Sequence, residues 1–452
     1  MSNSNFTTPN SRRVRLVTGL LIVILCAPAV AVAQERPSSL STLFEDIFGP
    51  RGLVVASQDV QLDGSNHAAH FNSAFQSDFR LMNIALTTQL AAIPLPSPAS
   101  GFTYRFDPAT GTFSRSTRSF GPILADRGET IGKGRMAFGF SHQYFSFDQL
   151  DGVALVSVPA VFTHDNFEAG GGRSDVIETR NTIQATVSQF SGALTYGVTD
   201  RFDLSLAVPI VRTRLSLLSN ATIQRVGTGA NVQVHYFPDE NAIGGFGSTK
   251  QFFAEGTAAG VGDMVIRAKG TVLREGPRAL AVGVDLRLPT GDERNLLGSG
   301  ATGVRPFAAF STSFGRFAPH ANIAYQWNGE SIIAGQVETG QKADLPDNFG
   351  YALGSDLSVN DRFSIVVDLA GQRVLDSPRL LRRQTTSTGP AGTVTLPDIR
   401  FETASYWVHS GALGFKANVA KSVLINFNLR FSMGDNGLSD RVAPLLGFEW
   451  AF

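Results

Sequence analysis

Bulky apolar residues alternate with small or polar residues along much of this chain. The residues from Arg441 to Phe452 show the pattern most clearly, because one face of an extended strand there carries Val442, Pro444, Leu446, Phe448, Trp450 and Phe452. The same alternation recurs in the segments that begin at Phe202, Leu280, Phe363 and Val423. A period of two is typical of a β-strand with one apolar face. The pattern therefore predicts an all-β fold.

The connections between these strands alternate between short and long. Short turns lie at residues 197–201, 274–277, 315–316, 359–362 and 418–421, and longer links lie at 149–175, 218–261, 291–303, 328–349, 375–404 and 433–440. A closed antiparallel barrel in an outer membrane has tight turns at one end and long loops at the other. A soluble β-sandwich also has strands with one apolar face, but it does not sort its loops by length.

We therefore predict a closed antiparallel transmembrane β-barrel of about twelve strands. The predicted strands are 134–148, 176–197, 201–217, 262–273, 279–290, 302–314, 316–328, 349–359, 362–374, 405–418, 422–432 and 441–452. If the mature chain crosses a membrane, it must do so with strands, because no stretch after residue 33 approaches the ~18 to 20 apolar residues of a spanning helix. Interfacial aromatic girdles are expected at the ends of the outward rows, at Trp327, Tyr325, Tyr351, Tyr406 and Trp450.

The first 33 residues have the pattern of a secretory signal peptide. Arg12, Arg13 and Arg15 precede an apolar run from Leu16 to Ala29, and the small-residue sequence Ala31-Val32-Ala33 follows. A basic start, a short apolar middle and an A-x-A exit predict export with cleavage before Gln34. The one cysteine, Cys26, lies in this segment, so the mature chain is predicted to have no disulfide.

Residues 34–132 lack the strand period and predict a mixed N-terminal segment before the barrel at 133–452. Apolar residues around Phe75, Phe79 and Leu86 favour a helix that ends before Pro94, and residues 102–106 and 112–115 favour a hairpin. Three arrangements are open: a plug inside the lumen, a periplasmic domain, or two further strands that would make fourteen. For a plug, the candidate apolar contacts to a solute are Phe75, Phe79 and Phe102.

Charge excludes one class of partner. The chain has 38 basic and 38 acidic residues, and only 17% of its residues are charged. A protein that binds nucleic acid needs a basic surface, so no nucleic acid partner is expected.

The inward positions of the predicted strands carry the candidate site residues. They are Arg267, Lys269, Asp285, Arg287, Arg305, His320, Asp356, Asp368, Arg430 and Glu449. Charges of both signs facing one lumen can pair across it and hold a plug in register, or they can steer a permeating solute. Both interpretations are open. The sequence lacks a G-x-S-x-G, H-E-x-x-H or P-loop pattern, so we expect no enzyme, no catalytic residue, no cofactor and no metal site.

Three runs of sequence resemble a known family. They are Gly262-Asp263-Met264-Val265-Ile266-Arg267-Ala268-Lys269, Val284-Asp285-Leu286-Arg287-Leu288-Pro289-Thr290-Gly291-Asp292-Glu293, and Leu297-Gly298-Ser299-Gly300-Ala301-Thr302-Gly303. They are similar to the outer-membrane barrels grouped with the meta-pathway phenol degradation proteins, which look like distant relatives of the transporters for long-chain fatty acids and aromatic hydrocarbons. Gly315 to His320 and Tyr325 to Gly329 continue the likeness.

The resemblance implies a passive transporter or channel in the bacterial outer membrane for small, hydrophobic or aromatic molecules. A general diffusion pore and a non-transporting structural or adhesive barrel are the alternatives. The expected partners are outer-membrane lipids, the small solute, and the barrel-assembly machinery, which reads a terminal aromatic residue such as Phe452.

Overall fold

The structure is a computed structural model that describes residues 39–49, 52–58, 71–72, 80–92, 104–107, 112–115, 120–164, 171–420 and 422–452. The predicted signal peptide lies outside these residues, and so do Phe75, Phe79 and Phe102.

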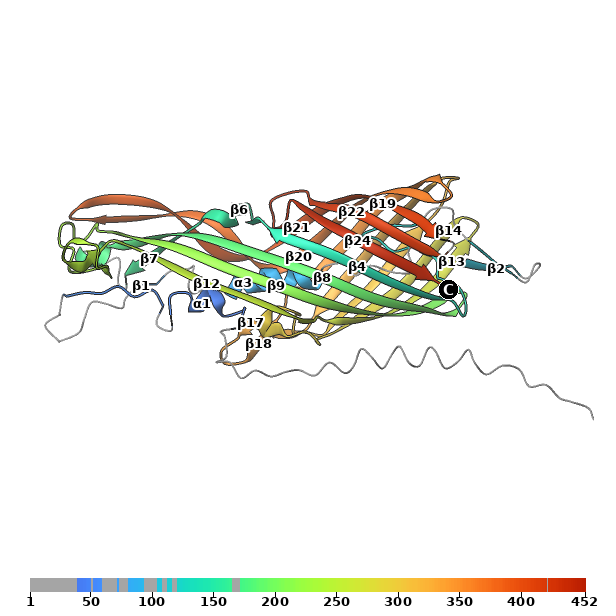
Figure 1. Cartoon of the computed structure of the whole chain (residues 1–452), viewed down its shortest axis with the longest axis horizontal. Helices are drawn as coiled ribbons and strands as arrows, with labels where there is room; N and C mark the ends of the chain where they lie inside the picture. Colours follow the sequence, from blue (N-terminus) through green and yellow to red (C-terminus); the bar gives the residue numbers. More distant parts are fainter. Residues whose placement is uncertain are drawn as a thin grey trace, which may run out of the picture. The chain divides into compact units, whose positions relative to one another are not determined.

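Twelve antiparallel strands of the described chain pair side by side and close into a ring (Figure 1). In ring order they are β4 (Met136–Phe147), β8 (Val176–Thr199), β9 (Phe202–Gln224), β13 (Met264–Glu275), β14 (Arg278–Leu288), β15 (Gly303–Ser311), β16 (Phe317–Asn328), β19 (Asn348–Asn360), β20 (Phe363–Gly389), β21 (Gly392–Ala420), β22 (Val423–Ser432) and β24 (Val442–Ala451). β24 pairs with β4 and completes the ring. The predicted closed barrel is confirmed with twelve strands, and the alternative of fourteen is wrong.

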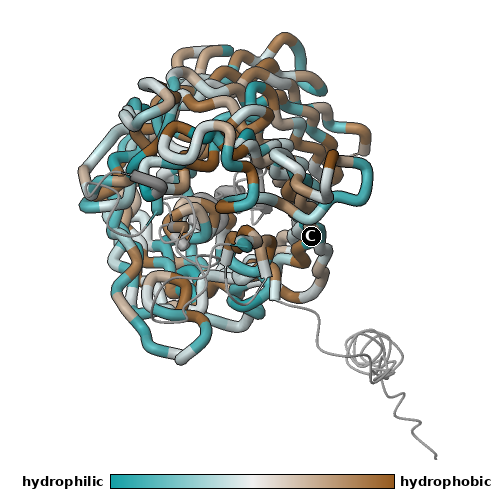
Figure 2. Tube along the Cα trace, turned by 90° about the vertical axis from the view of Figure 1, so that its left-hand side faces the viewer, coloured by the Kyte–Doolittle hydropathy of each residue, from teal (hydrophilic) through white to brown (hydrophobic). Residues whose placement is uncertain are grey.

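The wall strands expose their bulky apolar side chains on the outside. Leu206, Ile323, Val367 and Leu446 are 43%, 55%, 52% and 52% exposed, while residues next to them in sequence, such as Ala207 and Val366, are buried. Figure 2 views the strands end-on, and hydrophobic and hydrophilic stretches alternate along them. A protein whose apolar side chains packed in one dry interior would show the reverse pattern.

Aromatic residues cluster on the outer face of β19, β20 and β21, with one correction to the sequence prediction. The rings of Phe349 and Tyr351 lie 6.3 and 5.8 Å from that of Trp407. Tyr406 was expected on this outer face, but it is only 5% exposed and its ring lies under the guanidinium of Arg379. Neighbouring residues of a strand point to opposite faces, so the outward Trp407 forces Tyr406 inward.

The predicted long links at 149–175, 218–261 and 375–404 are also wrong in part, because each of them contains strand. Residues 375–404 belong mostly to a hairpin in which β20 and β21 remain paired as far as Gly389 and Gly392. Threonine pairs such as Thr386 with Thr395 connect its two strands. The polar composition suggested a loop, but β-branched threonine is well suited to a strand that has water on one face.

The link predicted at 218–261 contains β12 (Thr249–Val261), which pairs with the outer half of β9 and leads into β13. β7 (Val158–His164) pairs in the same way with the outer half of β8. Val161 and Val176 pack against Leu396 of the β20–β21 hairpin, so the two extended parts of the wall meet. Together these strands extend the wall beyond the apolar band on the side of the long loops.

The N-terminal segment contributes a helical and a hairpin part, as predicted. The helices are α1 (Leu43–Asp46) and α3 (Arg80–Ala92), and the hairpin pairs β2 (Tyr104–Asp107) with β3 (Thr112–Arg115). Leu43, Phe44 and Leu86 belong to one apolar cluster with inward residues of the extended wall such as Ile183 and Leu215. The described helices α1 and α3 therefore pack among inward residues of the extended wall and give it an apolar core, as a plug would.

Short elements complete the described chain. They are β1 (Phe71–Asn72), β5 (Gln149–Leu150), β6 (Val153–Ala154), η2 (Leu155–Ser157), η4 (Gly171–Ser174), β10 (Phe237–Pro238), η5 (Ile243–Gly245), β11 (Phe246–Gly247), η6 (Glu293–Asn295), β17 (Glu330–Gln336), β18 (Gln341–Asp344) and β23 (Leu438–Ser439).

A buried carboxylate anchors the loop that follows β9. Asp175 accepts hydrogen bonds from the backbone amides of Gly227 and Thr228 at 2.7 and 3.0 Å, and its Oδ2 lies 2.7 Å from Nδ1 of His235. Burial alone would raise the pKa of Asp175, but the bonds from His235, Thr228 and Gly227 outweigh it and hold the pKa below the usual 3.8.

This shift predicts a pH dependence with a defined sign. Since the folded pKa lies below 3.8, the carboxylate stabilises the loop at higher pH, and the stabilisation is lost as pH falls from about 3.8 through the folded pKa. Amide exchange of residues 225–235, corrected for intrinsic rates, should accelerate in that window. In Asp175→Asn the dependence should disappear, while Glu240→Gln, an exposed change nearby, should retain it. A wild-type pH profile in the Asp175→Asn variant would contradict the prediction.

The outward apolar row predicts how the barrel responds to charge. In lipid, Leu206→Arg should lower the free energy of unfolding by about 2 to 4 kcal/mol, the cost of arginine near the bilayer midplane. Ser216 lies on the same face of β9 beyond the apolar row, so Ser216→Arg should cost much less. Urea titration of the refolded protein in vesicles measures both, and equal losses would contradict a lipid-facing Leu206.

Candidate functional site

A segment without regular structure crosses the lumen and uses wall side chains as hydrogen-bond partners. We call residues 120–133 the strap. The amides of Ile123 and Leu124 donate to Oδ2 of Asp368 at 2.7 and 2.8 Å, and the amide of Gly128 donates to Oγ of Ser311 at 3.0 Å. Buried amides need hydrogen-bond acceptors, and an irregular segment has no paired strand to supply them. These wall side chains accept the hydrogen bonds instead.

The strap also approaches the wall very closely at one position. A Cβ at residue 128 would collide with the carbonyl oxygen of Ala279 on β14. Only glycine lets the strap lie against the wall here. Near its end, the amide of Ile131 donates to Oδ2 of Asp203 at 3.0 Å.

Three of the predicted site residues hold the strap rather than face open space. Nε2 of His320 lies 2.6 Å from Oδ1 of Asp368, and its Nδ1 lies 3.7 Å from Oδ1 of Asp356. On the strap, the guanidinium of Arg127 lies 3.5 Å from Asp356. All four side chains are at most 3% exposed. Buried charges need partners, and this cluster provides them.

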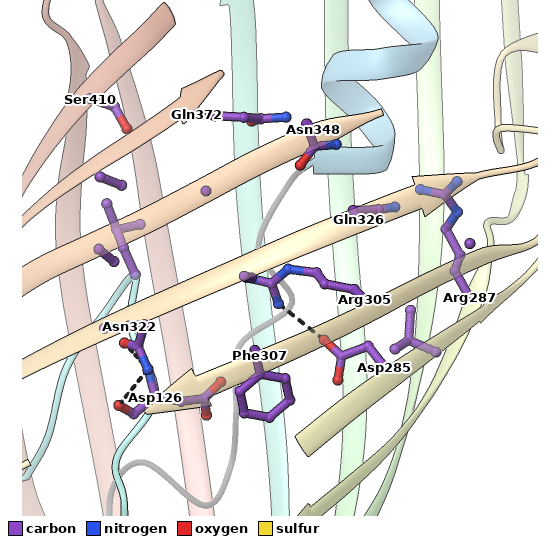
Figure 3. Close-up of a pocket in the computed structure, with 18 of the residues that line it drawn as sticks. Asp126, Asp285, Arg287, Arg305, Phe307, Asn322, Gln326, Asn348, Gln372 and Ser410 are labelled. Atoms are coloured by element: carbon purple, nitrogen blue, oxygen red, sulfur yellow. Dashed lines mark hydrogen bonds and ion pairs between the residues drawn. The ribbon is translucent and has the colours of Figure 1, made fainter. Parts of the chain in front are cut away.

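A second ion network joins three neighbouring strands to the strap. Arg267 on β13, Asp285 on β14 and Arg305 on β15 are direct cross-strand partners. Arg267 binds both carboxylate oxygens of Asp285, at 2.6 and 2.8 Å, and also contacts Asp126 of the strap at 2.5 Å. Arg305 lies 3.1 Å from the same Asp285, and Figure 3 marks this ion pair with a dashed line. Asn322 joins the network by accepting from the amide of Asp126.

Lys269 and Glu449 are bound to nearby groups. The ammonium of Lys269 donates to the carbonyl oxygen of Glu129 on the strap at 2.9 Å. Glu449 accepts from Lys416 of β21 at 3.1 Å. Neither residue lines the lumenal cavity described below.

Arg287 lies beside a bulge that shapes the top of the lumen. The register of β9 shifts by one residue between its pairing with β12 and with β13, at Gly262 and Asp263. Asp263 accepts from the amide and hydroxyl of Ser299 at 2.7 and 2.5 Å, and lies 3.7 Å from Arg287. Because of the bulge, the side chain of Asp263 points toward the link before β15, and its hydrogen bonds with Ser299 hold that link over the lumen.

Between the strap and this link lies a cavity of about 200 Å³. Five of the ten predicted residues line it: Arg267, Asp285, Arg287, Arg305 and Arg430. Apolar lining comes from Leu124, Val211, Leu297 and Phe307, and amides come from Gln189, Asn322, Gln326, Asn348 and Gln372. Lys269, His320, Asp356, Asp368 and Glu449 lie outside the cavity lining. These five hold the strap or the wall, while the other five face the cavity, and Arg267 does both through its contact with Asp126.

Sequence reasoning missed five charged residues that the structure places at the strap, the bulge and the wall: Asp126 and Arg127 on the strap, Asp203 on β9, Asp263 at the bulge, and Lys416. Asp203 and Lys416 had a usable signal, because each alternates with outward apolar residues in a clear strand. Asp126 and Arg127 follow no period, and a bulge breaks the period at Asp263.

The described residues contain no group of three or more histidine, cysteine, aspartate or glutamate side chains arranged to hold a metal ion. Within the same residues, no helix has the length and apolar character that crossing a membrane requires.

The strap contacts predict the effect of removing their main acceptor. Asp368→Ala leaves the amides of Ile123 and Leu124 without a carboxylate, at a local cost of about 1 to 3 kcal/mol. Their hydrogen exchange should accelerate by about five- to 150-fold. Asp368→Asn keeps one acceptor oxygen and should have a smaller effect, while Asp361→Ala in an exposed turn serves as the control. Unchanged exchange at residues 123 and 124 would show that the strap is held by other contacts.

A comparison with curated proteins finds no significant match. Solved structures with a related course of the chain include an outer membrane channel from Pseudomonas putida F1, at 14% identity and a TM-score of 0.42, covering 72% of this chain and 97% of the other. A FadL homologue from Pseudomonas aeruginosa has 11% identity and a TM-score of 0.30, with 78% and 94% covered. The toluene transporter TodX of P. putida has 9% identity and a TM-score of 0.30, with 71% and 90% covered.

The sequence model of the family described as "Putative MetA-pathway of phenol degradation" matches residues 164–398. This range is more than half of the chain, and the protein therefore belongs to that family.

Proposed function

We propose that this protein is a passive outer-membrane transporter for small, hydrophobic or aromatic molecules. One observation carries the proposal: a closed ring of strands exposes apolar side chains outward and encloses a small cavity lined by both polar and apolar groups. A soluble binding protein has no use for the outward face, whereas a conduit through lipid needs both faces.

The outward face supports a location in a membrane. Side chains such as Leu353 and Ile425, 48% and 42% exposed, would cost free energy in water and are stabilised against lipid tails. A closed ring also leaves no unpaired strand edge inside the bilayer, the condition that lipid imposes on β-structure. The predicted signal peptide supports export, and even-numbered barrels of this kind belong to bacterial outer membranes.

The size of the cavity supports a small solute. An engineered protein cavity of about 150 Å³ binds benzene, so a cavity of about 200 Å³ holds one small aromatic molecule. Twelve strands enclose less space than the 16 to 18 of an aqueous porin, and the strap occupies part of that lumen. The dimensions favour selective passage over general diffusion.

Uptake by whole cells tests the proposal against its two rivals. A porin-deficient bacterial strain expressing the protein should take up radiolabelled benzyl alcohol and benzoate several-fold faster than the empty-vector strain, with little change for sucrose. Equal gains for sucrose would instead identify a general pore. No gain for any solute would indicate a structural or adhesive barrel.

A cavity-filling variant makes the test specific to the lumen. Gly350 lines the cavity, and a Cβ there would meet no atom closer than 3.8 Å. Gly350→Phe should therefore enter the cavity and remove most of the added uptake. Gly192 offers the matched control, since a Cβ there meets nothing within 4 Å and it lies on the outer face between Phe190 and Leu194. Gly192→Phe should leave uptake unchanged, and equal losses in both variants would argue against passage through this cavity.

A further inference from the structure

The two sides of the lumenal cavity differ in how their hydrogen-bond donors are satisfied. On the side of β13 to β15, Arg267 and Arg305 share the carboxylate of Asp285, and Arg267 also binds Asp126. Arg267 and Arg305 each have an acidic partner within 3.1 Å, and Arg287 of β14 lies 3.7 Å from Asp263. A solute anion gains little from these groups, because the wall and strap already neutralise them.

On the opposite side, Arg430 of β22 lines the cavity without such a partner. Its neighbours in the register are Ala412 on β21 and Ala443 on β24, which offer no side-chain acceptor. Asp440 interacts with it electrostatically, but both oxygens of that carboxylate accept backbone amides, from Ser146 and Val442. Within the described chain, Arg430 makes no side-chain hydrogen bond or ion pair. A guanidinium left in this state inside a protein gains from any anion that reaches it.

Two further donors continue from Arg430 along the same wall. Ser410 of β21 and Gln372 of β20 both line the cavity, and Figure 3 shows their side chains on the same side of the view as Asn348. Nε2 of Gln372 is shielded from solvent and has no hydrogen-bond partner among the described residues. We call Gln372, Ser410 and Arg430 the donor wall.

The register brings the donor wall together. Ser410 pairs with Ser432, two residues from Arg430, and with Ala370, two residues from Gln372. Diagonal neighbours on one face of a sheet lie about 7 to 8 Å apart, which long side chains can bridge. Because Gln372 pairs with Val408 and Arg430 with Ala412, the two diagonals run in opposite directions from Ser410, and the three donors form a row along the cavity wall with Ser410 at its centre.

We propose that the donor wall binds the carboxylate of a small aromatic acid, while Leu124, Leu297 and Phe307 contact its apolar ring. This inference rests on the proposed function and narrows its substrate class. Arginine binds carboxylates strongly through paired, charge-assisted hydrogen bonds. The side-chain amide of Gln372 supplies a further donor, and a carboxylate oxygen of the solute would accept a hydrogen bond from it. A purely hydrophobic solute would leave all three donors without acceptors.

The experiment compares two probes that share a ring and differ in charge, benzoate and benzyl alcohol, at pH 7.5 in the porin-deficient strain. Arg430→Gln should reduce the initial rate of benzoate uptake by about ten-fold or more and change that of benzyl alcohol by less than two-fold. Gln372→Leu should reduce benzoate uptake by a smaller factor. Arg441→Gln is the matched control, because Arg441 is 90% exposed outside the lumen.

The outcomes separate this inference from the proposed function. If the wild-type protein carries neither probe, the proposed function fails. If it carries both, and Arg430→Gln changes both rates equally or neither rate, the donor wall does not select carboxylates and the inference is overturned. Because Arg430→Gln could impair folding, each variant is first checked for heat-modifiable migration on gels. If it does not fold, Gln372→Leu decides alone, and equal benzoate rates in that variant and the wild type overturn the inference.

Discussion

The architecture depends on satisfying every backbone hydrogen bond in a lipid environment. The ring meets this condition only if its first and last strands pair. Met136 and Phe452 exchange two backbone hydrogen bonds of 2.9 Å, and β4 and β24 pair along the seam above them. Once the edge is closed, strand alternation places one face toward lipid and the other toward the lumen. Both the apolar exterior and the polar interior follow from this closure.

A polar interior creates a second requirement, because charged side chains in a narrow lumen need partners. The strap supplies many of them: Arg127 pairs with Asp356, Asp126 with Arg267, and strap carbonyls accept from Lys269. In return, wall carboxylates such as Asp368 satisfy the strap's amides. Wall and strap thus stabilise each other, and the groups that this pairing leaves over are the ones available to a solute. Arg430 and Gln372 are the clearest of these.

Some features were predictable from residues alone, and the errors have identifiable causes. The alternation in β24, with Leu446 and Trp450 outward and Glu449 inward, was read correctly because a period of two survives in one strand. Tyr406 is an exception, because its alternation with the outward Trp407 places it inward. The link at 375–404 has the threonine-rich composition of a solvated segment, and composition alone does not distinguish a loop from a paired hairpin. Alternation along each strand is enough to predict which charges face the lumen, but it does not predict which of them hold the strap and which line the cavity.

The sequence by itself determined the class of fold, since apolar residues at every second position and loops sorted by length leave few arrangements other than a membrane barrel. Both are local patterns, which can be recognised in a single sequence. Only the tertiary structure decided which charges meet. The partnership of Asp126 with Arg267 joins residues 141 positions apart. Arg430 has no side-chain hydrogen bond or ion pair among the described residues, because its neighbours on the two adjacent strands are alanines. Such contacts depend on register, on a bulge at Asp263 and on the course of an irregular strap, none of which leaves a periodic trace in the sequence.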